Sequence, residues 1–168
     1  MKVSLFDASV PVFQRYLERL AGLVDAAEAH DEALLQARLA PDMLSFATQV
    51  VIAANFTLRA CFPLAGRELP PYGEFPATCA GLRQHIAHAA ALLASLTREE
   101  FERADASRLI ESRAGEAVVE LAPPAFLLQY ALPNFFFHLS TAYAILREQG
   151  VALGKAHFDG FHVYGSAT

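Results

Sequence analysis

Cysteine is scarce in this sequence: its 168 residues contain only two, Cys61 and Cys79. Two cysteines cannot form the disulfide framework of a small secreted protein, so both are expected to be small buried side chains. A basic segment followed by an apolar one is also missing after Met1, so no signal peptide is expected. These absences predict a cytoplasmic protein with reduced thiols.

Charged residues are few as well, at 18% of the chain, and their balance is acidic, with a formal net charge of -5 and a pI near 5.6. Proteins that bind nucleic acid concentrate positive charge, so no nucleic-acid partner is expected. Internal repeats and low-complexity segments are missing too. The length predicts a single domain over residues 1–168.

Apolar residues, by contrast, make up 54% of the sequence, and the mean hydropathy is +0.28. A membrane-spanning helix needs about 20 consecutive apolar residues, and no run is that long and uninterrupted, so no membrane partner is expected. A chain of this size buries about 70% of its unfolded surface. The remaining apolar excess predicts a covered subunit interface.

The longest apolar run is Pro123–Gln149, which we interpret as the central helix of a bundle. Its apolar residues occur nearly all round the helix, a pattern typical of an element that is covered on most sides. Pro123–Pro124 favours a helix start, and Gly150 favours a stop. Pro133 in the interior predicts a kink or a restart near Leu132.

Three further amphipathic helices are predicted at residues 8–29, 41–62 and 76–96, from apolar residues that recur at three- and four-residue steps. A capping box at Thr97–Glu100 predicts a short additional helix, and a small β-hairpin is predicted between Arg108 and Leu121. Four long helices predict an all-α four-helix bundle, whose two longer connections could be crossovers.

The central helix carries one polar stripe. With a rotation of 100° per residue, its members fall on one side of the helix: Tyr130, Asn134, His138 and Thr141. On an otherwise buried helix such a stripe needs partners from other helices. His138 is the candidate catalytic group, because a neutral imidazole can act as an acid or base near pH 7. The alternative is a structural histidine that is hydrogen-bonded to Gln49, Asn55 or a backbone carbonyl.

The second predicted helix supplies polar groups that could face His138. Asp42 also suits the first turn of that helix, where the helix dipole favours a carboxylate. Asn55 and Arg59 are expected to pair with each other, to pair with a carboxylate, or to lie at the solvent margin. The residues predicted to line a ligand pocket beside His138 are Asp42, Ser45, Gln49, Asn55, Tyr130, Asn134 and Thr141.

Other histidines are weaker candidates. His85 and His88 are three residues apart rather than the four of a helical zinc pair, so both are expected at the surface. His157, Asp159 and His162 superficially resemble metal ligands, but they lie in a glycine-containing terminal segment that is expected to be loose. A tail folded back over the bundle would change that expectation.

Five strings carry a resemblance to a known family: SVPVF (9–13), ARLAPDM (37–43), QVVIAANF (49–56), ALPNFFFH (131–138) and AYAILREQGVALGK (142–155). Over essentially the whole chain the sequence resembles a bacterial domain-of-unknown-function family of the DinB/YfiT-like metalloenzyme superfamily. The resemblance implies an up-down-down-up four-helix bundle and a homodimer. Relatives in the superfamily bind a divalent metal through one histidine on the second helix and an HxxxH pair on the fourth, and some are thiol-dependent transferases or isomerases.

The sequence departs from that metal pattern at two of the three positions. His138 matches the first histidine of the pair, but Ala142 stands four residues on. The second helix has no histidine, and Gln49 is its nearest polar residue. Zinc and nickel favour several nitrogen or sulfur donors, so His138 and Gln49 alone would hold them weakly.

Two functions therefore stay open beside a purely structural dimer. The first is a bundle that binds a small, partly apolar molecule without a complete metal triad. The second is a divalent-metal-dependent enzyme, of the thiol transferase or isomerase type, with zinc or nickel at a degenerate site around His138. That site would need further ligands from Asp42, Gln49 or the tail histidines. Whether the protein is an enzyme is not decided by the sequence.

Overall fold

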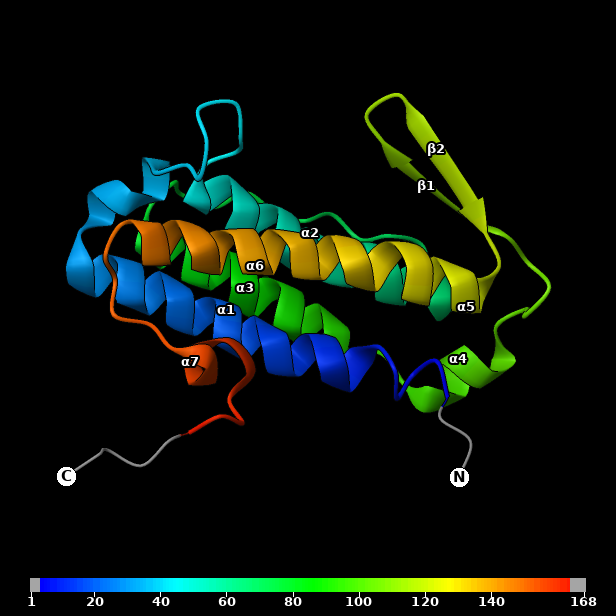
Figure 1. Ribbon diagram of the computed structural model, residues 1–168. Helices are drawn as coiled ribbons and strands as arrows, with labels where there is room; N and C mark the ends of the chain where they lie inside the picture. The colour runs from blue at the N-terminus through cyan, green and yellow to red at the C-terminus, as the bar shows by residue number, and fades with distance from the viewer. Residues whose placement is uncertain (1–3, 164–168) are drawn as a thin grey trace.

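The computed structural model describes residues 4–163, and its framework is four long helices (Figure 1). They are α1 (Val10–His30), α2 (Phe46–Leu64), α3 (Cys79–Ala94) and α6 (Leu132–Glu148). α1 and α6 run in one direction along the bundle, and α2 and α3 run in the other (Figure 1). The predicted all-α bundle with up-down-down-up order is therefore confirmed. None of the helices within residues 4–163 is both long and apolar enough to cross a membrane.

Of the two longer connections, only the first is a crossover. The segment between α2 and α3 returns along the bundle, so these two helices are parallel (Figure 1). The segment between α3 and α6 stays at one end of the bundle (Figure 1). It carries α4 (Arg98–Arg103) and two antiparallel strands, β1 (Ile110–Ala114) and β2 (Ala117–Leu121). The predicted hairpin is confirmed, and so is the capping box, in which the backbone N–H of Thr97 donates to the Glu100 carboxylate at 2.8 Å.

The central apolar run is interrupted where the sequence predicts it. It begins with a short turn, α5 (Pro123–Ala125), and continues as a π-helical turn, η2 (Phe126–Ala131), before α6 starts at Leu132. The backbone N–H of Leu132 donates to the carbonyl of Leu127, five residues back. Because Pro133 has no N–H to continue the α-helical pattern, the chain accommodates one wider turn just before it.

α2 begins at Phe46 and not at Pro41, so the predicted start is wrong. Ser45 is the N-cap, and its hydroxyl accepts a hydrogen bond from the backbone N–H of Thr48 at 3.4 Å. Serine is a stronger N-cap than the residues around Pro41, which form an exposed turn instead. Asp42 lies in that turn, so the predicted interaction of its carboxylate with the helix dipole is also wrong.

The core is apolar and lies between all four long helices. Its largest fully buried side chains include Phe13, Phe46, Phe62 and Phe135, and the rings of Phe13 and Phe135 meet edge to face at 5.0 Å. Cys61 and Cys79 are both buried free thiols, as expected. Burial raises the pKa of the Cys61 thiol above its usual range, so this thiol stays protonated and unreactive.

The C-terminal segment is folded up to residue 163, so the prediction of a loose tail is wrong for that part of it. α7 (Lys155–Asp159) packs against α1, and Arg15 donates to the carbonyl of Asp159 at 2.8 Å. The buried Asp159 carboxylate accepts hydrogen bonds from the backbone and imidazole of His162. The rest of the predicted tail, residues 164–168, lies outside the described residues.

Candidate functional site

His138 on α6 is hydrogen-bonded to Gln49 on α2, with 2.6 Å between Nδ1 and Oε1. An amide oxygen only accepts hydrogen bonds, so Nδ1 carries the proton and Nε2 keeps its lone pair. Gln49 is 1% exposed, and its amide nitrogen lies 3.4 Å from the carbonyl oxygen of Leu44. Burial lowers the pKa of His138, and the nearby charge of Arg59 lowers it further. The imidazole is therefore neutral at pH 7.

A second histidine makes an equivalent bond on the other side of α2. Nε2 of His85, on α3, lies 2.7 Å from Oδ1 of Asn55, and the His85 ring packs against Phe75 with 5.1 Å between centroids. Burial lowers the pKa of His85 too, so this imidazole is also neutral. The expected surface position is wrong for His85, which is buried, because it borders the apolar stripe of α3; His88 is partly exposed.

Gln49 and Asn55 do not face a common pocket. They are six residues apart, which places them about 120° apart around an α-helix. One therefore meets α6, and the other meets α3. The two histidine–amide pairs hold α2 against both of its main neighbours.

Arg59, one turn after Asn55 along α2, joins the helix to the hairpin. Its Nη2 donates to Ser112 Oγ at 2.8 Å, to the carbonyl of Arg113 at 2.6 Å and to the Tyr130 hydroxyl at 3.2 Å. The guanidinium lies over the Phe56 ring at 4.5 Å, and that ring also meets the rings of His138 and Tyr130, each with 5.9 Å between centroids. Arg59 thus pairs neither with Asn55 nor with any carboxylate among residues 4–163.

The other predicted pocket residues form local hydrogen bonds or face solvent. Asn134 donates to the carbonyl of Tyr130 at 2.8 Å, and Thr141 donates to that of Phe137 at 2.7 Å, so both bond within their own helical segment. Ser45 is occupied by capping α2, and Asp42 is exposed. Of the predicted set, the structure joins only Gln49 to His138 by a hydrogen bond.

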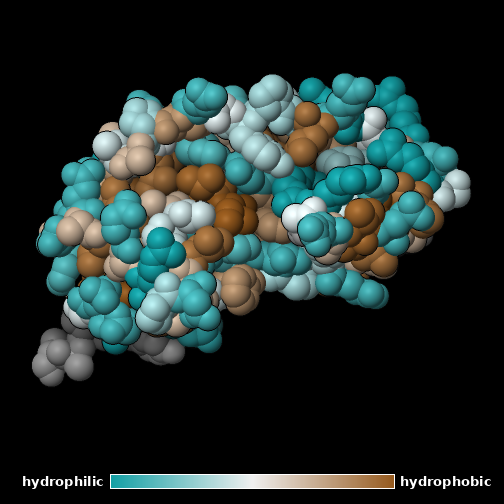
Figure 2. Space-filling model, turned by 90° about the horizontal axis from the view of Figure 1, so that it is seen from above, coloured by the Kyte–Doolittle hydropathy of each residue, from teal (hydrophilic) through white to brown (hydrophobic). Residues whose placement is uncertain are grey.

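Two clefts border α2. The first, here called the hairpin cleft, has a volume of about 350 Å³ and is lined by Arg59, Pro63, Leu69, Tyr72, Glu111, Ser112 and Arg113. The second lies between α2 and α3, has a volume of about 280 Å³ and includes Ser45, Phe75 and His85 in its lining. Figure 2, seen from above relative to Figure 1, shows apolar surface in the middle of the molecule, with hydrophilic residues gathered around it.

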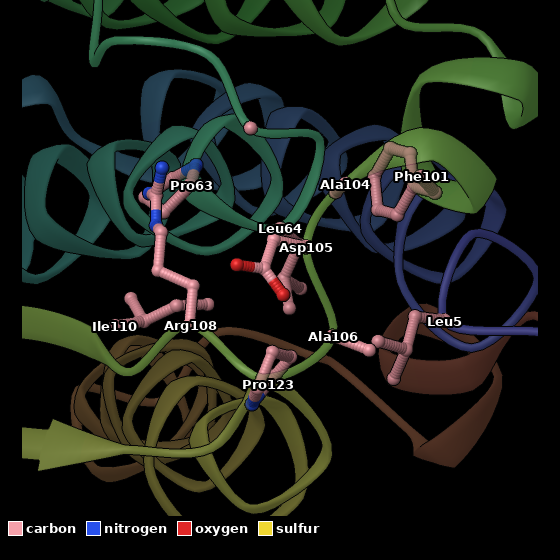
Figure 3. A pocket seen from close by; sticks show the side chains of 11 residues that line it. Leu5, Pro63, Leu64, Phe101, Ala104, Asp105, Ala106, Arg108, Ile110 and Pro123 are labelled. Atoms are coloured by element: carbon pink, nitrogen blue, oxygen red, sulfur yellow. The ribbon is translucent and has the colours of Figure 1, made fainter.

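A third cavity lies where the end of α2 meets the segment after α4 (Figure 3). Phe101, Ile110 and Pro123 are among its lining residues, together with the charged Asp105 and Arg108. Its volume is only about 50 Å³. That space holds one or a few water molecules and no metabolite, so this cavity is a seam between packed segments.

The residues do not fit the three-histidine metal site of the superfamily. Within residues 4–163 no group of three or more His, Cys, Asp or Glu side chains is arranged to hold an ion. His138 has an amide and aromatic rings as neighbours, and Ala142 one turn later has no donor atom. The tail residue Asp159 is engaged with His162 beside α1.

The fold and the histidine–amide pair define an up-down-down-up helical bundle without the histidine triad. Residues 5–159 match the family described as domain of unknown function (DUF1993), and the chain belongs to that family. A solved structure of a DinB family member from Shewanella denitrificans is similar over 97% of this chain and 96% of that one, with a TM-score of 0.84 and 31% identity. The DUF1993 chain therefore falls within the DinB-like superfamily, as the resemblance implied. A comparison with curated proteins gives no match.

Sequence reasoning missed His85, Tyr72 and Ser112. His85 was assigned to the surface because the spacing to His88 does not suit zinc, although its three-residue distance from the buried Leu82 was a signal for the helix interior. Tyr72 and Ser112 lie in the irregular connection and in the hairpin, where no periodicity indicates which way a side chain points.

Proposed function

We propose that the protein binds a small, partly apolar molecule in the hairpin cleft, through its own side chains and not through a bound metal. The observation that carries the proposal is the lining of this cleft, where apolar Pro63 and Leu69 line the same cleft as one fixed guanidinium, Arg59. Small-molecule sites combine an apolar lining with a few fixed polar groups in this way, and their volumes start near 300 Å³.

The polar groups of the cleft are held in place before any ligand arrives. Arg59 is fixed by three acceptors and by the Phe56 ring, so little side-chain entropy is lost when it meets a ligand. Burial raises the pKa of Tyr72, which keeps its phenol protonated as a neutral donor. The cleft therefore offers one unpaired positive charge on Arg59, an Arg113–Glu111 ion pair, hydroxyl groups and apolar side chains.

For His138 we propose a positioning role in this site. Its ring packs against Phe56, and the Phe56 ring packs against the guanidinium of Arg59. Gln49 fixes the orientation of the imidazole, so the three stacked groups form a rigid column from α6 to the hairpin. The catalytic role of His138 stays a prediction.

A titration with benzamide, a small neutral aromatic probe, tests the ligand proposal. Amide chemical-shift changes in ¹⁵N-labelled protein are expected around Tyr72 and Ser112. Leu69→Asp should abolish them, because it places a charge in the apolar wall. Leu44→Asp is the matched control, since Leu44 is similarly exposed and does not line this cleft. Shift changes scattered over the surface, or equal losses in both variants, would reject the hairpin cleft as the site.

Metal analysis tests the other half of the proposal. The purified protein is expected to contain no stoichiometric zinc, nickel or iron, and added Zn²⁺ should leave its melting temperature unchanged. A metal that bound only the native state would raise that temperature by mass action. One bound metal per chain that is lost in His138→Ala would overturn the metal-free assignment in favour of the degenerate-site enzyme.

We further propose that the protein is a homodimer whose interface includes Phe137. This side chain is 56% exposed on the outer face of α6, and Leu128 is 58% exposed on the turn before it. Light scattering after size exclusion should give twice the chain mass, and Phe137→Glu should reduce it to one chain. Val118→Glu, at an exposed apolar position in the hairpin, is the control. Monomeric wild-type protein would reject this proposal.

A further inference from the structure

The positive charge of Arg59 has no acidic partner in the hairpin cleft. Its three hydrogen bonds all leave from Nη2 and end on neutral oxygens, two hydroxyls and a carbonyl. Among residues 4–163 no carboxylate lies within ion-pair distance of this guanidinium. Glu111, the acidic residue of the cleft lining, is paired instead with Arg113 at 2.9 Å.

The bonds of Arg59 also leave part of its hydrogen-bonding capacity unused. A guanidinium has five N–H donors, and only those on Nη2 are engaged with described residues. Nε and Nη1 are left to bind an acceptor from outside the chain. The side chain is partly buried, which strengthens its interaction with an anion compared with a fully exposed arginine.

The other residues of the cleft indicate what the uncharged part of a bound anion would be. Pro63, Leu69 and the ring of Tyr72 form its apolar side. A phosphate group carries about two negative charges, whereas the lining supplies one unpaired guanidinium and no helix N-terminus to bind them. A single carboxylate matches the single unpaired charge, and an apolar or aromatic body matches the apolar part of the lining.

We propose that the ligand of the hairpin cleft is a small monocarboxylic acid with an apolar or aromatic body, whose carboxylate is bound by Arg59 through Nε or Nη1. This inference rests on the proposed function and adds the chemical class of the ligand. Tyr72 contacts the body of the acid, and Ser112 keeps Arg59 in place.

The test compares benzoate with benzamide, which have nearly the same shape and differ in charge. Both are titrated into the full-length protein at concentrations up to about 10 mM, where binding in the millimolar range is detectable. Benzoate should bind at least about tenfold more tightly than benzamide, the difference that one charge-assisted hydrogen bond supplies. Arg59→Gln should remove that difference, and Arg103→Gln, at an arginine outside the cleft, should preserve it.

Each outcome is decisive for the carboxylate assignment. Equal binding of benzoate and benzamide in the cleft overturns it and leaves the proposed function standing. Binding of benzamide alone does the same, and binding of neither probe overturns both proposals. Because Arg59 also holds the hairpin, Arg59→Gln is accepted only if benzamide still shifts the amides around Tyr72 and Ser112, which shows that the cleft is intact. If benzamide binding is lost, Arg59→Lys replaces it, and this variant should keep a preference for benzoate because it keeps the charge.

Discussion

Nδ1 of His138 and Oε1 of Gln49 lie 2.6 Å apart, in a bond that joins α6 to α2. The amide oxygen accepts the hydrogen bond from Nδ1, and it holds the imidazole in one tautomer. Such an interhelical bond between two side chains contributes to stability chiefly because either group alone would be left unsatisfied.

Gln49→Leu should therefore destabilise the protein by about 1–3 kcal/mol, since it leaves the partly buried Nδ1–H of His138 without its acceptor. Urea denaturation at pH 7.5 measures this loss in the free energy of unfolding. The double variant Gln49→Leu/His138→Phe should cost less than the sum of the single changes, because it removes both polar groups together. Ser140→Ala, on the exposed face of α6, is the control and should stay within about 0.5 kcal/mol. A Gln49→Leu variant as stable as this control would contradict the structure.

Stability should fall as the pH falls through the range in which histidine titrates. The pKa values of His138 and His85 are both lowered from the ordinary 6.5, so the unfolded chain binds protons that the folded chain does not. Their contribution is fully present above pH 6.5 and is lost as the pH falls toward the folded-state values. Urea denaturation between pH 7.5 and 5.0 should show this decline. The double variant His85→Gln/His138→Gln should have a flatter profile, and an unchanged slope would count against buried neutral imidazoles.

Arg59→Met should release the hairpin from α2. A two-stranded hairpin is at best marginally stable alone, and Arg59 supplies two of the side-chain bonds that hold it, to Ser112 and to the Arg113 carbonyl. Limited trypsin digestion followed by mass spectrometry should show faster cleavage after Arg113, with the four long helices still protected. Arg103→Met, which loses a bond only to its own helix, is the control. Equal cleavage rates in both variants would show that the hairpin is held by other contacts.

Two glycine-to-alanine changes in long helices should have opposite signs. At Gly22, in α1, an added Cβ meets no atom within 4 Å, so alanine should stabilise the protein by about 0.5–1 kcal/mol through the lower entropy of the unfolded chain. At Gly81, in α3, the Cβ would lie 1.9 Å from the backbone carbonyl oxygen of Pro76. That overlap forces α3 away from the preceding segment, and Gly81→Ala should destabilise by about 1–3 kcal/mol. Thermal unfolding distinguishes the two, and a stable Gly81→Ala variant would refute this close approach.

The sequence predicted the helices well because their signals are local. Apolar spacing located the four long helices, and the family resemblance gave their directions. The capping box at Thr97–Glu100 and the interruption before Pro133 follow from backbone chemistry that acts within a few residues. The start of α2 was missed because two local signals competed, and the hydroxyl of Ser45 was the stronger cap.

The candidate site was predicted less completely, because its parts come from distant segments. The partnership of His138 with Gln49 was one of the alternatives that the residues suggested. That Asn55 bonds to His85 on α3, and not to His138 on α6, depends on which helix packs against each face of α2. The folding of residues 155–162 beside α1, and the approach of the hairpin to Arg59, join segments far apart in the chain.

By itself, then, the sequence determined an all-α bundle without a complete set of metal-binding residues, since periodicity and residue chemistry are properties of each segment alone. Tertiary structure decided which polar groups meet. It buried His85 against Asn55, turned Asp42 out to solvent, and set the unpaired charge of Arg59 at the edge of a cleft. Those outcomes depend on the rotation of each helix about its axis and on the path of the connections, which packing of the common core fixes.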